Sequence, residues 1–180
     1  MAGQKNILIG VTASIAAYKS CELITSLRRE GYAVKVAMSP DSHHFITPLT
    51  LQTLSVNKVI SDMFALPEEW DVCHVSLAKW ADLILVAPAS ADMIAKLAHG
   101  RADCIISATI LSAKADVLIT PAMNDNMYRH PSVQQNIRSL KRMGYKFIGP
   151  KHGRLACGDQ GIGHIAGTKE IVLAVKRLLK

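Results

Sequence analysis

The chain has 180 residues and a formal net charge of +7, and 49% of its residues are hydrophobic. This length and composition fit one globular domain and exclude an intrinsically disordered chain. No apolar run is long enough to span a membrane, and the N-terminus lacks a signal peptide's apolar core, so a cytoplasmic protein without a membrane partner is expected. The four cysteines are scattered and form no CxxC pair, so neither a metal site nor a disulfide framework is predicted. Only 5% of the residues are aromatic, which is low for base stacking, so no nucleic-acid partner is expected.

Apolar strands alternate with amphipathic helices along the chain. The expected strands are 7–11, 33–38, 83–87, 115–120 and 146–148, and the expected helices are 14–30, 45–54, 91–98, 102–111, 132–143 and 168–179. A further short helix is expected just after His74. Near-continuous apolar strands are typical of a parallel sheet that is covered on both faces. The sequence therefore predicts one three-layer α/β domain over residues 1–180, flavodoxin- or Rossmann-like, whereas residues 56–71 and 150–167 lack periodicity and are expected to be long loops.

Two strand-to-helix turns have the composition of a phosphate site. The first, residues 10–19, places small residues and two hydroxyls at a helix N-terminus, where free N–H groups and the helix dipole favour an anion. Residues 87–92 repeat the pattern, and Ser39, at the end of the second strand, could form a third wall. Neither turn is a GxGxxG or Walker sequence, which disfavours nicotinamide binding and ATP hydrolysis. A serine helix cap explains the first turn equally well, but two such turns side by side would form a mononucleotide cradle.

Three further segments carry groups suited to chemistry. In residues 121–128, Asn124 stands between Met123 and Met127, so its amide could hold a carboxylate against an apolar wall, or could cap a helix. His74 is suited to acid/base work near neutral pH, although a lone histidine is more often structural. Residues 156–164 place Cys157 among glycines, where its thiol could deliver a proton or attack an electrophile; a flexible surface loop is the alternative.

Together these segments resemble the homo-oligomeric flavin-containing cysteine decarboxylases. The resemblance rests on residues 10–19, 45–52, 74–82, 87–96, 121–128 and 156–163, and its specific signatures are Pro-x-Met-Asn-x-x-Met and Ala-Cys-Gly-Asp-x-Gly-x-Gly. It implies an FMN cofactor and sites formed between the subunits of a homotrimer or a trimer-based dodecamer. The implied reaction is the decarboxylation of 4'-phosphopantothenoylcysteine to 4'-phosphopantetheine in coenzyme A biosynthesis, through thioaldehyde and enethiol intermediates.

The resemblance also implies roles for individual residues. His74 is the expected acid/base residue, Asn124 the ligand of the substrate carboxylate, and Cys157 the group that serves the final reduction. The expected flavin-binding residues are Thr12, Ser14, Ile15, Ser39, Ala87, Ser90 and Ala91, and the expected substrate-binding residues are Ala122, Met123, Asn124 and Met127. No metal is expected. A phosphopantothenate–cysteine ligase is the implied partner or fused domain, and residues 1–180 contain no such synthetase domain.

Other functions compete with this interpretation. A peptidyl-cysteine decarboxylase of lantibiotic maturation stops at the enethiol, which Cys157 disfavours, and a flavin prenyltransferase should lack the Pro-x-Met-Asn signature. A non-catalytic phosphatase-regulatory relative is disfavoured because His74, Asn124 and Cys157 occur together. The chain departs from the family pattern at three positions, with Tyr128 in place of Trp, Ala13 in place of Gly and His164 in place of Arg.

Overall fold

A six-stranded parallel sheet forms the centre of the computed structural model, which describes residues 3–64, 72–156 and 158–180. Its strands are β1 (Asn6–Val11), β2 (Ala33–Met38), β3 (Val59–Ile60), β4 (Leu83–Ala89), β5 (Asp116–Pro121) and β6 (Lys146–Phe147). The helices are η1 (Ile15–Tyr18), α1 (Lys19–Arg29), η2 (Pro40–His44), α2 (Pro48–Ser55), α3 (Cys73–Trp80), α4 (Ala91–Ala98), α5 (Ile105–Ser112), α6 (Asp125–Arg129), α7 (Pro131–Arg142) and α8 (Thr168–Leu178), of which η1 and η2 are 3-10 helices. None of the described helices is long and apolar enough to cross a membrane.

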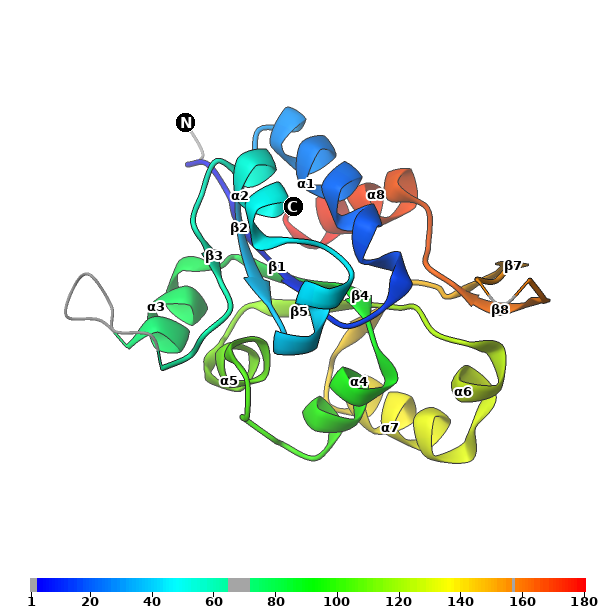
Figure 1. Ribbon diagram of the computed structural model, residues 1–180. Coiled ribbons are helices and arrows are strands. Elements are labelled where there is room, and N and C mark those ends of the chain that lie inside the picture. Colours follow the sequence, from blue (N-terminus) through cyan, green and yellow to red (C-terminus); the bar gives the residue numbers. More distant parts are fainter. Residues whose placement is uncertain (1–2, 65–71, 157) are drawn as a thin grey trace.

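Helices cover both faces of the sheet (Figure 1). Successive side chains of a strand point to opposite faces, so each strand supplies two cores. Ile7 and Ile9 of β1 pack in a core with α1, α2 and α8, whereas Leu8 packs in a second core with α3, α4, α5 and α7. All three side chains are 0 or 1% exposed. The predicted three-layer fold is confirmed.

The strands follow the order β3-β2-β1-β4-β5-β6, and every neighbouring pair is parallel. This is the strand order of Rossmann domains, in which the chain direction across the sheet reverses between β1 and β4. Because α1 and α4 lie on opposite faces, a crevice opens outside the carboxyl ends of these two strands. The topology therefore brings together the two turns that the sequence singled out.

Several predicted boundaries shift for local reasons. The helix expected from residue 102 begins at Ile105, because Cys104 occupies its N-cap position. The helix expected from residue 45 begins at Pro48, with the Thr47 hydroxyl as its cap. His74 lies inside α3 rather than before it. Strand β3 lies within the stretch expected to be a loop from residue 56, and residues 65–71 are outside the described part of the chain.

The predicted loop over residues 150–167 is wrong for much of its length. Strands β7 (Lys151–Arg154) and β8 (Gln160–His164) form an antiparallel hairpin that stands beside the main sheet (Figure 1). Glycines at positions 153, 161 and 163 interrupt the alternation by which a strand is recognised in a sequence. The hairpin lies at the same edge of the sheet as the carboxyl ends of β4 and β5, beside the segment that follows β5.

Candidate functional site

A cavity of about 620 Å³ lies at the carboxyl edge of the sheet. Its volume falls within the range of about 300–1,000 Å³ that small-molecule sites occupy. The turns after β1, β4 and β5 form one part of its wall, and the hairpin forms another. The predicted site residues that line it are Ser14, Ile15, Ser90, Ala91, Ala122, Met123, Asn124 and Met127.

Two helix N-termini face this cavity. The Ser14 hydroxyl caps η1, which runs directly into α1; it accepts from the N–H of Ala16 at 3.3 Å and donates to the carbonyl of Ala122 at 3.1 Å. The Ser90 hydroxyl caps α4 and accepts from the N–H of Met93 at 3.2 Å. The first turn of a helix has unpaired N–H groups and the positive end of the helix dipole. Both turns are therefore suited to an anionic group, as predicted for a phosphate.

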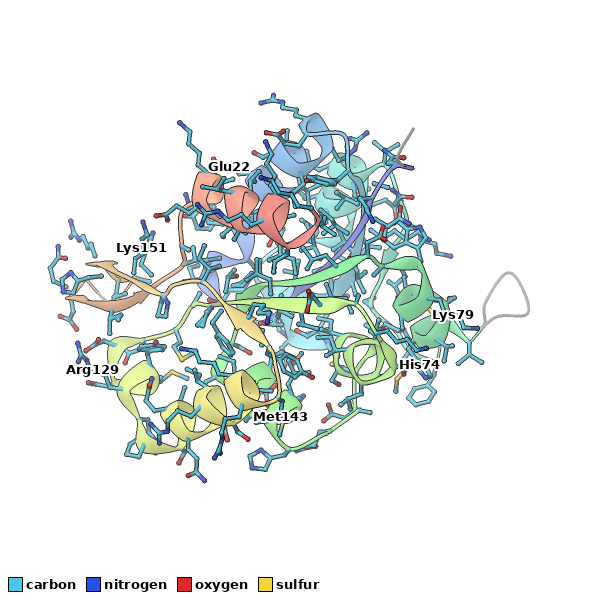
Figure 2. The ribbon with its side chains drawn as sticks, turned by 180° about the vertical axis from the view of Figure 1, so that it is seen from behind. Glu22, His74, Lys79, Arg129, Met143 and Lys151 are labelled. Carbon is cyan, nitrogen blue, oxygen red and sulfur yellow. The ribbon has the colours of Figure 1, made fainter. Side chains whose placement is uncertain are left out.

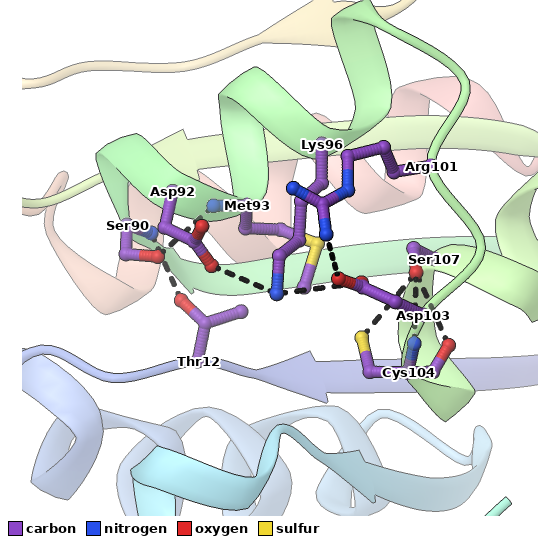
Figure 3. Close-up of polar contacts among 9 residues, drawn as sticks. All are labelled: Thr12, Ser90, Asp92, Met93, Lys96, Arg101, Asp103, Cys104 and Ser107. Carbon is purple, nitrogen blue, oxygen red and sulfur yellow. Dashed lines mark hydrogen bonds and ion pairs between the residues drawn. The ribbon is translucent and has the colours of Figure 1, made fainter.

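Thr12 lies beneath the two turns rather than on the cavity wall (Figure 3). Its side chain is buried, and its hydroxyl donates to the carbonyl of Pro88 at 2.8 Å while it accepts from the N–H of Ser90 at 2.9 Å. One hydroxyl thus joins the ends of β1 and β4. Thr12 therefore supports the two cavity-lining turns from the protein interior and does not itself line the cavity.

An ion network runs along helix α4 from its first turn to the loop that follows it (Figure 3). Lys96 Nζ lies 3.2 Å from the Asp92 carboxylate and 3.3 Å from that of Asp103, which Arg101 also contacts at 2.8 Å. The Lys96 side chain is only 21% exposed, but Asp92 and Arg101 are 68% and 64% exposed, so water screens much of this network. The network holds α4 against the loop before α5, and so helps to orient the N-terminus that faces the cavity.

We expect Thr12→Val to lower the free energy of unfolding by about 1–3 kcal/mol, because the isosteric side chain removes the partner of one carbonyl and one N–H. Urea denaturation would measure the change. Thr109→Val is the matched control, since the Thr109 hydroxyl is buried with no hydrogen-bond partner among the described residues. Its removal should be neutral or stabilising. Equal destabilisation of both variants would contradict the bridging role of Thr12.

Ser39 and Ala87, also expected at the flavin, do not line the cavity. Ser39 follows β2, and its N–H donates to the carbonyl of Val11 at 2.9 Å, which places it beside the end of β1. Ala87 is buried in β4, where its carbonyl accepts from the Ser20 hydroxyl at 2.8 Å. Their contacts with a flavin stay predictions.

Asn124 stands at the N-cap of α6 and also lines the cavity. Its side-chain oxygen accepts from the N–H of Asn126 at 2.9 Å, so the interpretation of Asn124 as a helix cap is correct. Met123 and Met127 lie on either side of it in the cavity wall. The cap fixes the direction of the Asn124 side chain, which leaves a polar group held in an apolar surround.

Strand β8 packs directly against the segment that carries Asn124. The N–H of Met123 donates to the carbonyl of Gly163 at 3.1 Å. A Cβ at Gly163 would collide with the Met123 carbonyl oxygen, and a Cβ at Gly161 would lie 2.8 Å from the Cβ of Asp125. Only glycine permits this approach at the two positions. The contact brings four hairpin residues to the cavity wall, namely Arg154, Leu155, Ala156 and His164.

His74 does not meet Asn124 within one chain. It lies in the first turn of α3, and Figure 2 shows it on the side of the molecule opposite Lys151 and Arg129, which belong to the hairpin and to α6. It is not among the residues that line the cavity. Cys157 lies outside the described residues, so its expected role stays a prediction.

Sequence reasoning did not predict Arg154 as one of the basic residues that line the cavity. Lys19, at the start of α1, and Arg154, at the end of β7, both line it, together with His164. No motif singled out Arg154, although it comes just before the glycine-rich segment. No cluster of three or more His, Cys, Asp or Glu that could hold a metal ion occurs among the described residues.

The family model described as Flavoprotein matches residues 1–180. The chain belongs to this flavoprotein family. A probable phosphopantothenoylcysteine decarboxylase of Streptococcus mutans is 45% identical to the chain over 177 residues, which are 97% of the chain and 99% of that protein. The resemblance to the flavin-containing cysteine decarboxylases that the sequence predicted is confirmed.

Two longer relatives are named coenzyme A biosynthesis bifunctional protein CoaBC. The one from Haemophilus influenzae is 43% identical and the one from Bacillus subtilis 45% identical, over 95% and 96% of the chain. The chain spans 43% and 42% of their respective lengths.

Solved structures of cysteine decarboxylases share the whole fold. A cysteine-to-serine mutant of PPC decarboxylase complexed with pantothenoylaminoethenethiol superposes with a TM-score of 0.89 at 28% identity, covering 97% of the chain and 98% of that structure. The FMN-dependent cysteine decarboxylase SpaF superposes with a TM-score of 0.85 at 27% identity, covering 98% of both chains.

Proposed function

We propose that the chain catalyses the FMN-dependent decarboxylation of 4'-phosphopantothenoylcysteine to 4'-phosphopantetheine in coenzyme A biosynthesis. One observation carries the proposal: a single cavity combines the capped turns after β1 and β4 with Asn124 and the glycine-rich hairpin. The Streptococcus mutans relative, which matches the chain almost end to end, supports the choice of substrate.

The residues of the cavity fit FMN. The helix N-termini at Ser14 and Ser90 would hold its phosphate, and apolar side chains such as Ile15 and Met123 would contact its ring system. When bound, FMN supplies reversible two-electron chemistry. Such chemistry makes the loss of carbon dioxide feasible, because a thioaldehyde beside the reacting carbon can take up the electron pair as an enethiolate. An unoxidised N-acyl cysteine has no comparable electron sink.

The chain's own residues would bind the substrate and move protons. The Asn124 amide would bind the substrate carboxylate between Met123 and Met127, where an apolar surround strengthens the hydrogen bonds. His74 would act as the acid/base group, and Cys157 would supply a proton when the enethiol is reduced.

The distance of His74 from the cavity of its own chain supports a site shared between copies. We propose that a second copy contributes His74, in a homotrimer or a trimer-based dodecamer. Large apolar side chains stand exposed at both places that would meet: Ile15 is 61% and Tyr18 is 56% exposed beside the cavity, and Val72 is 58% exposed beside α3. Exposed apolar side chains of this kind often mark protein interfaces. A phosphopantothenate–cysteine ligase, as a separate partner or a fused domain, would supply the substrate, which the bifunctional relatives support.

The direct test is to load the purified protein with FMN, incubate it with 4'-phosphopantothenoylcysteine and identify the product by mass spectrometry. The expected product is lighter by one carbon dioxide and shows no net oxidation. A product that lacks two further hydrogens would contradict the complete cycle, and unchanged substrate would contradict the proposed function.

Arg154→Gln is expected to raise KM for the phosphorylated substrate about tenfold, because Arg154 lines the cavity and the variant would lose a charge-assisted hydrogen bond to the substrate phosphate. KM for unphosphorylated pantothenoylcysteine should hardly change. Lys151→Gln is a matched control, since Lys151 lies on the same strand but pairs with Glu170 at 2.6 Å. If Arg154→Gln raised both KM values equally, Arg154 would not recognise the phosphate.

A further inference from the structure

Asp125 holds the hairpin against the segment that carries Asn124. One of its carboxylate oxygens accepts from the N–H of Ile162 in β8 at 2.8 Å, and both accept from Nε of Arg129 at 2.9 Å. The hydrogen bond from Arg129 and the N–H of Ile162 both lower the pKa of Asp125. The side chain is therefore a charged acceptor at neutral pH, the form that accepts the stronger hydrogen bond.

This contact joins two walls of the cavity, although Asp125 itself does not line it. The preceding residue, Asn124, belongs to the wall formed after β5, whereas Arg154 and His164 belong to the hairpin wall. Any ligand that touches Asn124 and the hairpin together depends on the spacing between these walls.

The hairpin depends on such contacts because two isolated strands are at best marginally stable in water. At its base, Lys151 pairs with Glu170 of α8 at 2.6 Å, but both side chains are about half exposed, so water screens this pair and it contributes little to stability. Farther along the hairpin, the Asp125 carboxylate accepts a hydrogen bond from the N–H of Ile162 in β8. Gly161 lies so close to Asp125 that a Cβ added at Gly161 would be 2.8 Å from the Cβ of Asp125. The close fit at Gly161 fixes the spacing of the walls.

We propose that Asp125 is a positioning residue that sets the spacing between Asn124 and the hairpin wall. It acts on substrate through its neighbours and makes no contact with the reacting atoms. The substrate named in this proposal rests on the proposed function. The hydrogen bond between Asp125 and Ile162 does not depend on that function.

Hydrogen exchange tests the contact without any turnover. In the FMN-loaded protein, Asp125→Ala should speed the exchange of the Ile162 amide about tenfold or more, because that N–H loses its acceptor. Lys151→Gln, the matched control at the hairpin base, should leave the Ile162 amide protected. Unchanged exchange in Asp125→Ala would overturn the proposal, even if the wild-type protein did not decarboxylate the substrate.

Kinetics then separate positioning from general stability. Asp125→Ala should lower kcat/KM about ten- to a hundredfold, as small misplacements of a substrate do, with flavin affinity and Tm close to those of the wild type. Asp125→Asn keeps an acceptor for Ile162 and should restore most of the activity. Gly161→Ala, which pushes the walls apart without removing the carboxylate, should reproduce the loss. Wild-type kcat/KM in Asp125→Ala, or a parallel loss of flavin and Tm, would overturn the positioning role.

Discussion

His74→Asn is expected to lower kcat by about a hundred- to ten-thousandfold while the protein keeps its flavin. An amide matches the size of the imidazole but cannot exchange a proton near neutral pH. The flavin should remain because the residues of the cavity are untouched in every copy. Gel filtration followed by the flavin absorption spectrum measures retention, and mass spectrometry measures the product. Normal turnover in this variant would refute the acid/base role of His74.

Mixing two inactive variants shows whether the site is shared. Asn124→Asp places a negative charge against the substrate carboxylate and should also be inactive, although its own His74 is intact. If each site takes His74 from one copy and Asn124 from another, co-expression of the two variants in equal amounts should restore about a quarter of the sites, because the copies combine at random. Each variant expressed alone is the control. No recovery in a verified mixed oligomer would place both residues of a site in the same copy.

The fold was predictable from the sequence because its signal is local. Runs such as residues 83–87 are apolar throughout, as a strand buried on both faces requires, and glycine or serine marks the following turns. Ser14 and Ser90 were therefore placed correctly at two neighbouring strand ends. The hairpin escaped prediction because the reason for Gly161 and Gly163 lies in a segment about forty residues away, at Asp125 and Met123.

The site was less predictable because a motif names residues without giving the direction of their side chains. Thr12 carries a hydroxyl of the kind that binds phosphate, but this hydroxyl donates to the carbonyl of Pro88 and accepts from the N–H of Ser90. These hydrogen bonds form only because β1 and β4 are neighbours in the sheet. Arg154 reaches the cavity only because the hairpin docks on the Asn124 segment. His74 shows the same limit, since a single sequence does not state which copy of the chain a residue serves.

Cys157→Ser is expected to change the product rather than to stop the reaction. A hydroxyl is a far weaker acid than a thiol, so the proton needed when the enethiol is reduced would not be delivered. Carbon dioxide should still be released, because His74 and Asn124 are unchanged. Mass spectrometry should show a product two hydrogens lighter than 4'-phosphopantetheine, with the flavin left reduced until an external oxidant restores it.

Cys21→Ser is the control for the loss of a thiol. Cys21 lies on α1 and does not line the cavity, and burial raises the pKa of its thiol, so we expect the variant to give the complete product. Complete product from Cys157→Ser as well would mean that another group delivers the final proton. His164 and Arg154 both line the cavity from the described part of the hairpin, and histidine, unlike arginine, is a common general acid, so His164 would then be the residue to replace next.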